Sequence, residues 1–157
     1  MSEAGFADGG ARDALPVAPS PQGRYVPAVV HAGMAYSAGM TPRVDGELTR
    51  RGTVGVEVSI EHARELAGLA AANALAAIAD AVGGLDNIER CVQLRVYVAA
   101  AAGFTAHTSI ADGASERLQA ALGERGAAAR SAIGVAGLPS GAPVEVELVA
   151  AVRGSRP

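Results

Sequence analysis

Short runs in which hydrophobic and polar residues alternate predict several strands along this chain. These runs are residues 25–30, 34–38, 88–99, 129–135 and 144–152. A turn at residues 31–33 has a length that suits a hairpin between the first two strands. Residues 41–55 are interrupted by proline and glycine, so they predict a loop with room for a brief edge strand at 46–49.

Two other segments have the composition and spacing of helices. Ser59 is placed as an N-cap, Glu61 follows in the first turn, and residues 60–82 are rich in alanine and leucine. Gly83 and Gly84 predict the end of this helix. A second, shorter helix is predicted at 112–122, after an irregular segment or single turn at 103–110.

The resulting order is strand, strand, helix, strand, helix, strand, strand, which predicts an α/β (α+β) fold. The natural packing is one sheet with two helices on one face. Residues 92, 94, 96 and 98 would then face the helices, and Gln93, Arg95 and Tyr97 would face away, as would Glu145 and Glu147. This second face is either solvated or buried against copies of itself in a symmetric oligomer, with Arg95 pairing a glutamate.

Residues 1–24 are rich in glycine, alanine, proline and serine and show no sustained period. They predict a flexible N-terminal arm, followed by a single domain at 25–157. The first residues lack the apolar region of a signal peptide. The most apolar stretch, 66–79, is well short of the roughly 20 residues of a spanning helix. We therefore expect a cytoplasmic protein with no membrane contact.

The charge balance and the few histidines and cysteines exclude several classes of site. The chain carries 13 Lys and Arg against 16 Asp and Glu, a net charge of −3, so no nucleic-acid partner is expected. The three histidines lack ligand spacing and Cys91 is the single cysteine, so we expect no metal site. Cys91 is interpreted as a small buried hydrophobe in a reducing compartment.

Arg130 is the candidate that carries chemistry, because a charge stands among small residues at the mouth of an apolar strand. An arginine holds a carboxylate through two parallel hydrogen bonds. Glu145, on a strand expected to be its neighbour, could orient or deprotonate a water near the bound acid. The alternative is a purely structural salt bridge between Arg130 and Glu145.

Several motifs resemble one known family in order and spacing. They are Tyr25-Val26-Pro27-Ala28-Val29, Tyr36-Ser37-Ala38-Gly39, Asn73-Ala74-Leu75-Ala76-Ala77-Ile78, Ala129-Arg130-Ser131 with Leu138-Pro139, and Val144-Glu145-Val146-Glu147. The chain is similar over residues 25–152 to the Rid (YjgF-type) family of reactive-intermediate deaminases. It looks most like the longer branch, in which GFTAHTSIADGASERL follows the third strand.

The resemblance implies a chorismate-mutase-like fold of the bacterial AroH type, with a mixed sheet and two helices on one face. It also implies a homotrimer with ligand clefts between subunits. Members hydrolyse enamine or imine acids of the 2-aminoacrylate type to 2-oxo acids and ammonia, without a cofactor. The alternatives are a non-catalytic trimer that binds a small carboxylate as a sensor, and an endoribonuclease, which the acidic balance and scarce aromatics disfavour.

The resemblance also assigns roles to individual residues. Arg130 matches the arginine that clamps the substrate carboxylate, and Glu145 matches the glutamate that positions the attacking water. Tyr25 matches a tyrosine that lines the cleft, and Gly39 a backbone contact near the imine. Asp112 stands where an asparagine is common, so a carboxylate lies close to the expected anion.

Two further departures lie near the expected site. Met40 follows Ala38-Gly39 where many members have Ser-Gly-Gln, which removes an amide. Gly137 replaces an arginine that often precedes Leu-Pro. Together with Asp112, these changes make the substrate the open question for this chain.

Overall fold

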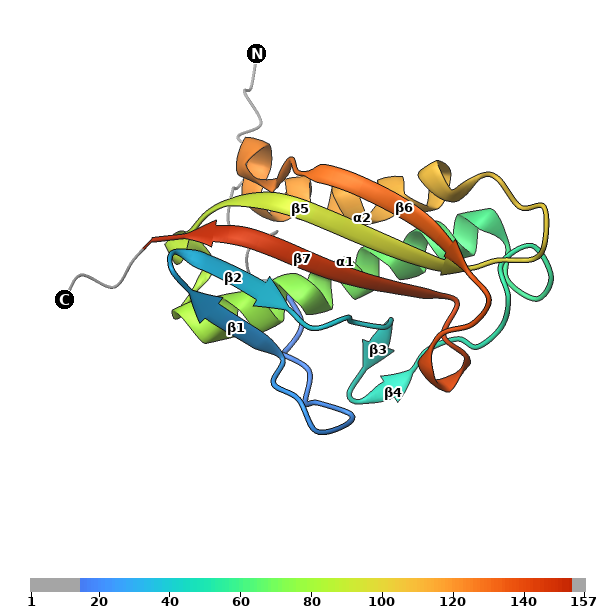
Figure 1. Ribbon diagram of the computed structural model, residues 1–157, viewed down its shortest axis with the longest axis horizontal. Helices are drawn as coiled ribbons and strands as arrows, with labels where there is room; N and C mark the ends of the chain where they lie inside the picture. The colour runs from blue at the N-terminus through green and yellow to red at the C-terminus, as the bar shows by residue number, and fades with distance from the viewer. Residues whose placement is uncertain (1–14, 154–157) are drawn as a thin grey trace, which may run out of the picture.

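A five-stranded mixed sheet with two long helices behind it forms the core of the protein (Figure 1). The computed structural model describes residues 15–153. The strand order is β1-β2-β7-β5-β6, and the predicted fold class is confirmed. The strands are β1 (Ala28–His31), β2 (Met34–Ser37), β5 (Ile88–Ala99), β6 (Ala129–Val135) and β7 (Val144–Val152).

Strands β5 and β6 pair in parallel and are connected through α2 (His107–Leu122). The β1–β2, β2–β7 and β5–β7 pairs are antiparallel. The predicted hairpin between β1 and β2 turns at Ala32 and Gly33, whose φ angles of 49° and 76° are the positive values that two-residue hairpin loops need. In sheet order β5 lies between β6 and β7, and this position separates the candidate residues described below.

A small second sheet occupies the segment for which a brief edge strand was predicted. It pairs β3 (Arg43–Val44) with β4 (Glu47–Leu48), so the expected edge strand at 46–49 is instead half of a separate hairpin. The buried Asn73 amide donates hydrogen bonds to the carbonyl oxygens of Thr41 and Arg43, both at 3.1 Å. These bonds fasten the loop that follows Gly39 to the first helix.

Helix α1 (Ile60–Val82) begins and ends where its sequence predicts. The Ser59 hydroxyl accepts a hydrogen bond from the His62 N–H, and Gly83 ends the helix at a φ of 86°. The helix is long and apolar enough to cross a membrane, but 61% of its most apolar window is buried inside the fold. It is therefore the core helix that covers the sheet, as Figure 1 shows.

Helix α2 begins at His107, five residues before the predicted start at 112. The segment His107-Thr108-Ser109 has low intrinsic helix propensity, which favoured an irregular interpretation. Ile110 and Ala111 are buried against the core, and this tertiary packing outweighs the local preference. The predicted irregular segment at 103–110 is therefore wrong for its last four residues.

The predicted alternation along β5 fails at Val92, the first position that was expected to face the helices. A register shift between Cys91 and Gln93 places Cys91 in the core and leaves Val92 exposed, so Val92 does not face the helices. Burial raises the pKa of the Cys91 thiol to about 11, which keeps it protonated at neutral pH. The interpretation of Cys91 as a buried hydrophobe is confirmed.

Part of the predicted N-terminal arm is in contact with this core. Residues 1–14 lie outside the described residues, and Leu15 packs against the hydrophobic core. Pro16 lines a groove between the two helices.

The two helices approach each other closely at paired glycines. A Cβ atom on Gly113 would lie 2.0 Å from the carbonyl oxygen of Arg64 in α1, and one on Gly68 would lie 3.3 Å from the carbonyl oxygen of Gly113. Because the first contact is with backbone, a side chain at Gly113 forces the helices apart rather than displacing a flexible group. Gly113 thus fixes how near α2, which carries Asp112, lies to α1.

We predict that Gly113→Ala destabilises the protein by about 1–3 kcal/mol, the usual cost of overpacking. In an open helix the same change would stabilise by roughly 0.5–1 kcal/mol, so the sign of the effect tests the contact. Thermal or urea unfolding measures it. Gly137→Ala is the matched control, since a Cβ atom there meets nothing within 4 Å; an equal loss in both variants would contradict the prediction.

Candidate functional site

Arg130 is held by two residues of α2. Its Nη1 donates hydrogen bonds to Oδ1 of Asp112 at 2.8 Å and to Oγ of Ser115 at 2.9 Å. The Arg130 side chain is 20% exposed and that of Asp112 is 44% exposed. The structure therefore brings together two of the predicted site residues, Arg130 and Asp112, in a partly buried ion pair.

Ser115 was missed by the sequence reasoning, although the signal was present. It follows Asp112 by three residues, and such positions share one face of a helix. Once α2 packs beside β6, both side chains meet the same guanidinium. The position of Arg130 relative to α2, which the sequence did not give, was needed to assign Ser115 a role.

The structure does not bring Arg130 and Glu145 together within one chain. Arg130 pairs in register with Leu94, which is buried on the helix-covered face of the sheet. Glu145 pairs with Tyr97, which points to the opposite face because side chains alternate along β5. The expectation that Glu145 lies on the neighbouring strand is wrong, because β5 separates β6 from β7. A structural Arg130–Glu145 salt bridge within one chain is excluded for the same reason.

Glu145 instead lies against Gly39, another predicted site residue. A Cβ atom on Gly39 would be 2.4 Å from Oε1 of Glu145, so a larger residue at this position would displace the carboxyl group. Reciprocal backbone hydrogen bonds between Met40 and Val146, of 2.7 and 2.8 Å, hold the two segments together. Because Gly39 has no side chain, the Glu145 carboxyl group can occupy the space next to its Cα atom.

Tyr25 lies at the same end of the sheet as Gly39. The N–H of Ala38 donates to the carbonyl oxygen of Pro27 at 2.8 Å, which sets the segment before β1 beside the end of β2. The Tyr25 hydroxyl accepts a hydrogen bond from the Gln22 N–H at 3.1 Å, and the residue is about half exposed. Tyr25 and Gly39 therefore lie at one end of the sheet, and of these two residues Gly39 is the one in contact with Glu145.

The uncovered face around Glu145 carries a charged network. Oε1 of Glu147 accepts hydrogen bonds from the Tyr97 hydroxyl at 2.6 Å and from Nη1 of Arg95 at 3.0 Å. The hydrogen bond to Glu147 raises the pKa of Tyr97. Arg95 thus pairs with a glutamate of its own chain, so its pairing needs no second copy of the protein.

Glu145 has no cation of this network as a hydrogen-bonded partner among the described residues. Burial raises the pKa of Glu145 above its ordinary value, and the nearby negative charge of Glu147 raises it further. A carboxyl group with a raised pKa accepts a proton more readily than an ordinary glutamate does. This property suits a group that takes a proton from water.

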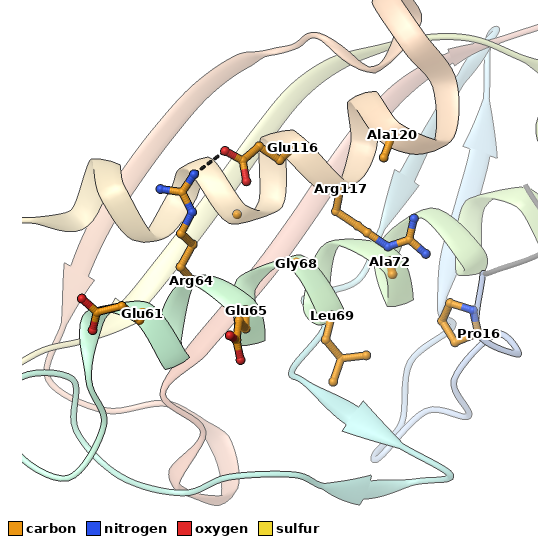
Figure 2. A pocket seen from close by; sticks show the side chains of 11 residues that line it. Pro16, Glu61, Arg64, Glu65, Gly68, Leu69, Ala72, Glu116, Arg117 and Ala120 are labelled. Carbon is orange, nitrogen blue, oxygen red and sulfur yellow. Dashed lines mark hydrogen bonds and ion pairs between the residues drawn. The ribbon is translucent and has the colours of Figure 1, made fainter. Parts of the chain in front are cut away.

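The groove lined by Pro16 lies elsewhere, between the outer sides of α1 and α2 (Figure 2). Its volume is about 840 Å³. Leu69 and Ala72 contribute apolar surface, and an ion pair joins Arg64 to Glu116 across the two helices. None of the five predicted site residues lines this groove.

Among residues 15–153, no group of three His, Cys, Asp or Glu side chains could hold a metal ion.

Comparison with known proteins identifies the family. The model of the family described as endoribonuclease L-PSP, which is the YjgF/Rid family, matches residues 15–152. The chain belongs to the YjgF/Rid family. The resemblance drawn from the motifs around Arg130 and Glu145 is therefore confirmed.

Relatives within this family differ in how closely they match. Protein TCP17 of Trypanosoma cruzi is 34% identical over 85% of this chain and 84% of its own length. The Agrobacterium tumefaciens protein Atu1372, of unknown function, is 34% identical, with a TM-score of 0.81 over 85% of each chain. The YjgF gene product of E. coli is 24% identical, covers 88% of this chain and 94% of its own, and has a TM-score of 0.59. At that identity the last comparison supports the fold alone.

We predict that Asp112→Ala lowers the free energy of unfolding by about 1–2 kcal/mol, because it removes a charge-assisted hydrogen bond from a largely buried guanidinium. Glu116→Ala is the matched control on the same helix. Its ion pair with Arg64 is more exposed, at 62% for Glu116, and should contribute less than about 1 kcal/mol. Denaturant unfolding compares the two; an equal or larger loss at Glu116 would refute the assignment.

Proposed function

We propose that this family member is a hydrolytic deaminase of small enamine and imine acids, and that its active site forms between copies of the chain in a homotrimer. The observation that carries the proposal is the separation of Arg130 from Glu145 on opposite faces of the sheet. Both residues match family positions, yet one chain cannot use them on one small ligand. A second copy resolves this conflict by bringing its own Glu145 group to the Arg130 of its neighbour.

The surface of the chain supports association with further copies. The face of the sheet opposite the helices exposes the large apolar side chains of Val29, Tyr36 and Ile133. Strand β6, which carries Arg130, is at the edge of the sheet. Exposed apolar side chains and an open strand edge are features that oligomers cover.

The proposed reaction assigns one task to each of two residues. Arg130 binds the carboxylate of the substrate, and Glu145 accepts a proton from a water molecule. The oxygen of that water bonds to the electrophilic imine carbon, and the carbon–nitrogen bond breaks as the nitrogen is protonated. One imine acid and one water thus give one 2-oxo acid and one ammonia. An enamine first becomes the imine by taking a proton on carbon.

Two alternative functions, a sensor and an endoribonuclease, can be distinguished from the deaminase by the experiments described below. A sensor would bind a small carboxylate without turning it over. An endoribonuclease is the activity in the family's description. The two carboxylates Glu145 and Glu147 on the uncovered face, and the net charge of −3, oppose binding of a phosphate backbone.

We predict that the protein accelerates ammonia release from 2-aminoacrylate generated in situ by a dehydratase. Glu145→Gln should slow this step by about 10²–10⁴-fold, the usual contribution of a general base. Arg130→Ala should abolish acceleration at low substrate concentration. Ligand binding without turnover would indicate the sensor instead, and RNA cleavage that survives purification and is lost in Glu145→Gln would indicate the nuclease.

The pH profile should report the same carboxyl group. Because the base must be ionised, activity is lost as pH falls through the raised pKa of Glu145. The acid limb of kcat/KM therefore lies above the ordinary glutamate value of 4.5 and is absent in Glu145→Gln.

Mixed trimers test whether the site is shared between chains. Arg130→Ala and Glu145→Gln proteins are each inactive alone under the proposal. After they are unfolded and refolded together in equal amounts, about a quarter of the shared sites combine a native Arg130 with a native Glu145. About a quarter of wild-type activity should return, in particles with the sedimentation mass of three chains. No recovery, or a monomer mass, would contradict the shared site.

A further inference from the structure

We propose that the Arg130–Asp112 pair makes this site selective for zwitterionic acids, in which one carbon carries both a carboxylate and a cationic nitrogen. The inference rests on the proposed function and names its substrate class more narrowly. A protonated 2-imino acid has both charges, whereas the 2-oxo acid product has the carboxylate alone. Asp112 is the residue to which this discrimination is assigned.

The contacts of Arg130 leave part of its guanidinium for a ligand. Both of its hydrogen bonds to described residues start from Nη1 and end on Asp112 and Ser115. Nη2 and Nε have no partner within residues 15–153, and these two donors form one edge of the planar guanidinium. A ligand carboxylate can bind this edge without displacing Asp112.

Asp112, the carboxylate partner of the same guanidinium, likewise offers an unused acceptor. Its Oδ1 accepts the bond from Arg130, and its Oδ2 has no hydrogen-bond partner among the described residues. The Asp112 side chain is more exposed than that of Arg130. Asp112 is therefore joined by one hydrogen bond of 2.8 Å to Nη1 of a guanidinium whose other two donors remain open.

The electrostatics of this pair favour a ligand of matching polarity. A simple anion bound to Arg130 is attracted by the guanidinium but repelled by Asp112 a few ångströms away. A zwitterion gains a second attraction, because its cationic nitrogen lies next to its own carboxylate and can approach Asp112. An asparagine in place of Asp112 would keep the size of the side chain and lose the preference.

The proposed reaction would then weaken the binding of the ligand when substrate becomes product. Hydrolysis breaks the bond to nitrogen, which leaves as ammonium, and water supplies the oxygen of the new carbonyl group. The remaining 2-oxo acid has lost the charge that Asp112 attracts and keeps the charge that Asp112 repels. The same carboxylate thereby favours substrate binding and product release.

Three matched ligands test this inference directly. Alanine, lactate and pyruvate share a three-carbon skeleton and a carboxylate, and only alanine adds a cationic nitrogen. Calorimetry or competition against 2-aminoacrylate turnover gives their affinities. Wild-type protein should bind alanine at least about tenfold more tightly than lactate or pyruvate, as expected for one added charge pair near a protein surface.

Two variants assign the preference to Asp112. In Asp112→Asn the alanine preference should fall to within about threefold, mainly through tighter binding of pyruvate and weaker binding of alanine. Glu116→Gln makes the same change of charge on the same helix, away from Arg130, and should keep the preference. Unfolding curves check that both variants are folded.

The outcomes separate this inference from the function on which it rests. Turnover of 2-aminoacrylate by wild-type protein with equal binding of alanine and pyruvate would overturn the zwitterion preference and leave the deaminase standing. A preference that survives in Asp112→Asn would overturn the role of Asp112. Neither turnover nor binding of any of the three ligands would remove both proposals. The wild-type comparison needs no variant, so the inference can be refuted even where Asp112→Asn does not fold.

Discussion

Strand β5 lies between the two strands that carry the candidate residues, and this arrangement constrains every functional argument about the protein. Because side chains alternate across a sheet, the register of β5 sends Arg130 to the helix-covered face and Glu145 to the open face. No side-chain rotation reverses that separation. A site that uses both residues on one small ligand has to be completed by another chain. Activity through this site would therefore depend on the association of chains.

The ion pair between Arg130 and Asp112 has a structural part and a chemical part. It holds a partly buried guanidinium in a fixed orientation, with Ser115 as a second acceptor. It also lowers the net positive charge presented to a ligand. An asparagine could still accept one hydrogen bond, but a weaker one without the ionic attraction, and it would leave the positive charge of Arg130 unneutralised. The carboxylate at position 112 therefore acts both on stability and on the choice of ligand.

Local sequence signals predicted most elements because their determinants lie within each element. The Ser59 cap and the Gly83 stop delimit α1, and alternation delimits β6 and β7. The failures occurred where tertiary packing decides. Burial of Ile110 extends α2 toward its N-terminus, and a bulge in β5 exchanges the positions of Cys91 and Val92.

The sequence by itself determined the family, the strands and two helices of the fold, and the residue types available for chemistry. These follow from periodicity, caps and motifs, which can be read along one dimension. Only the tertiary structure decided which of those residues meet: Asp112 with Arg130, Gly39 with Glu145, and Arg95 with Glu147. Strand order and sheet face are long-range properties, set by how β5 is inserted between β6 and β7, and no local pattern records them.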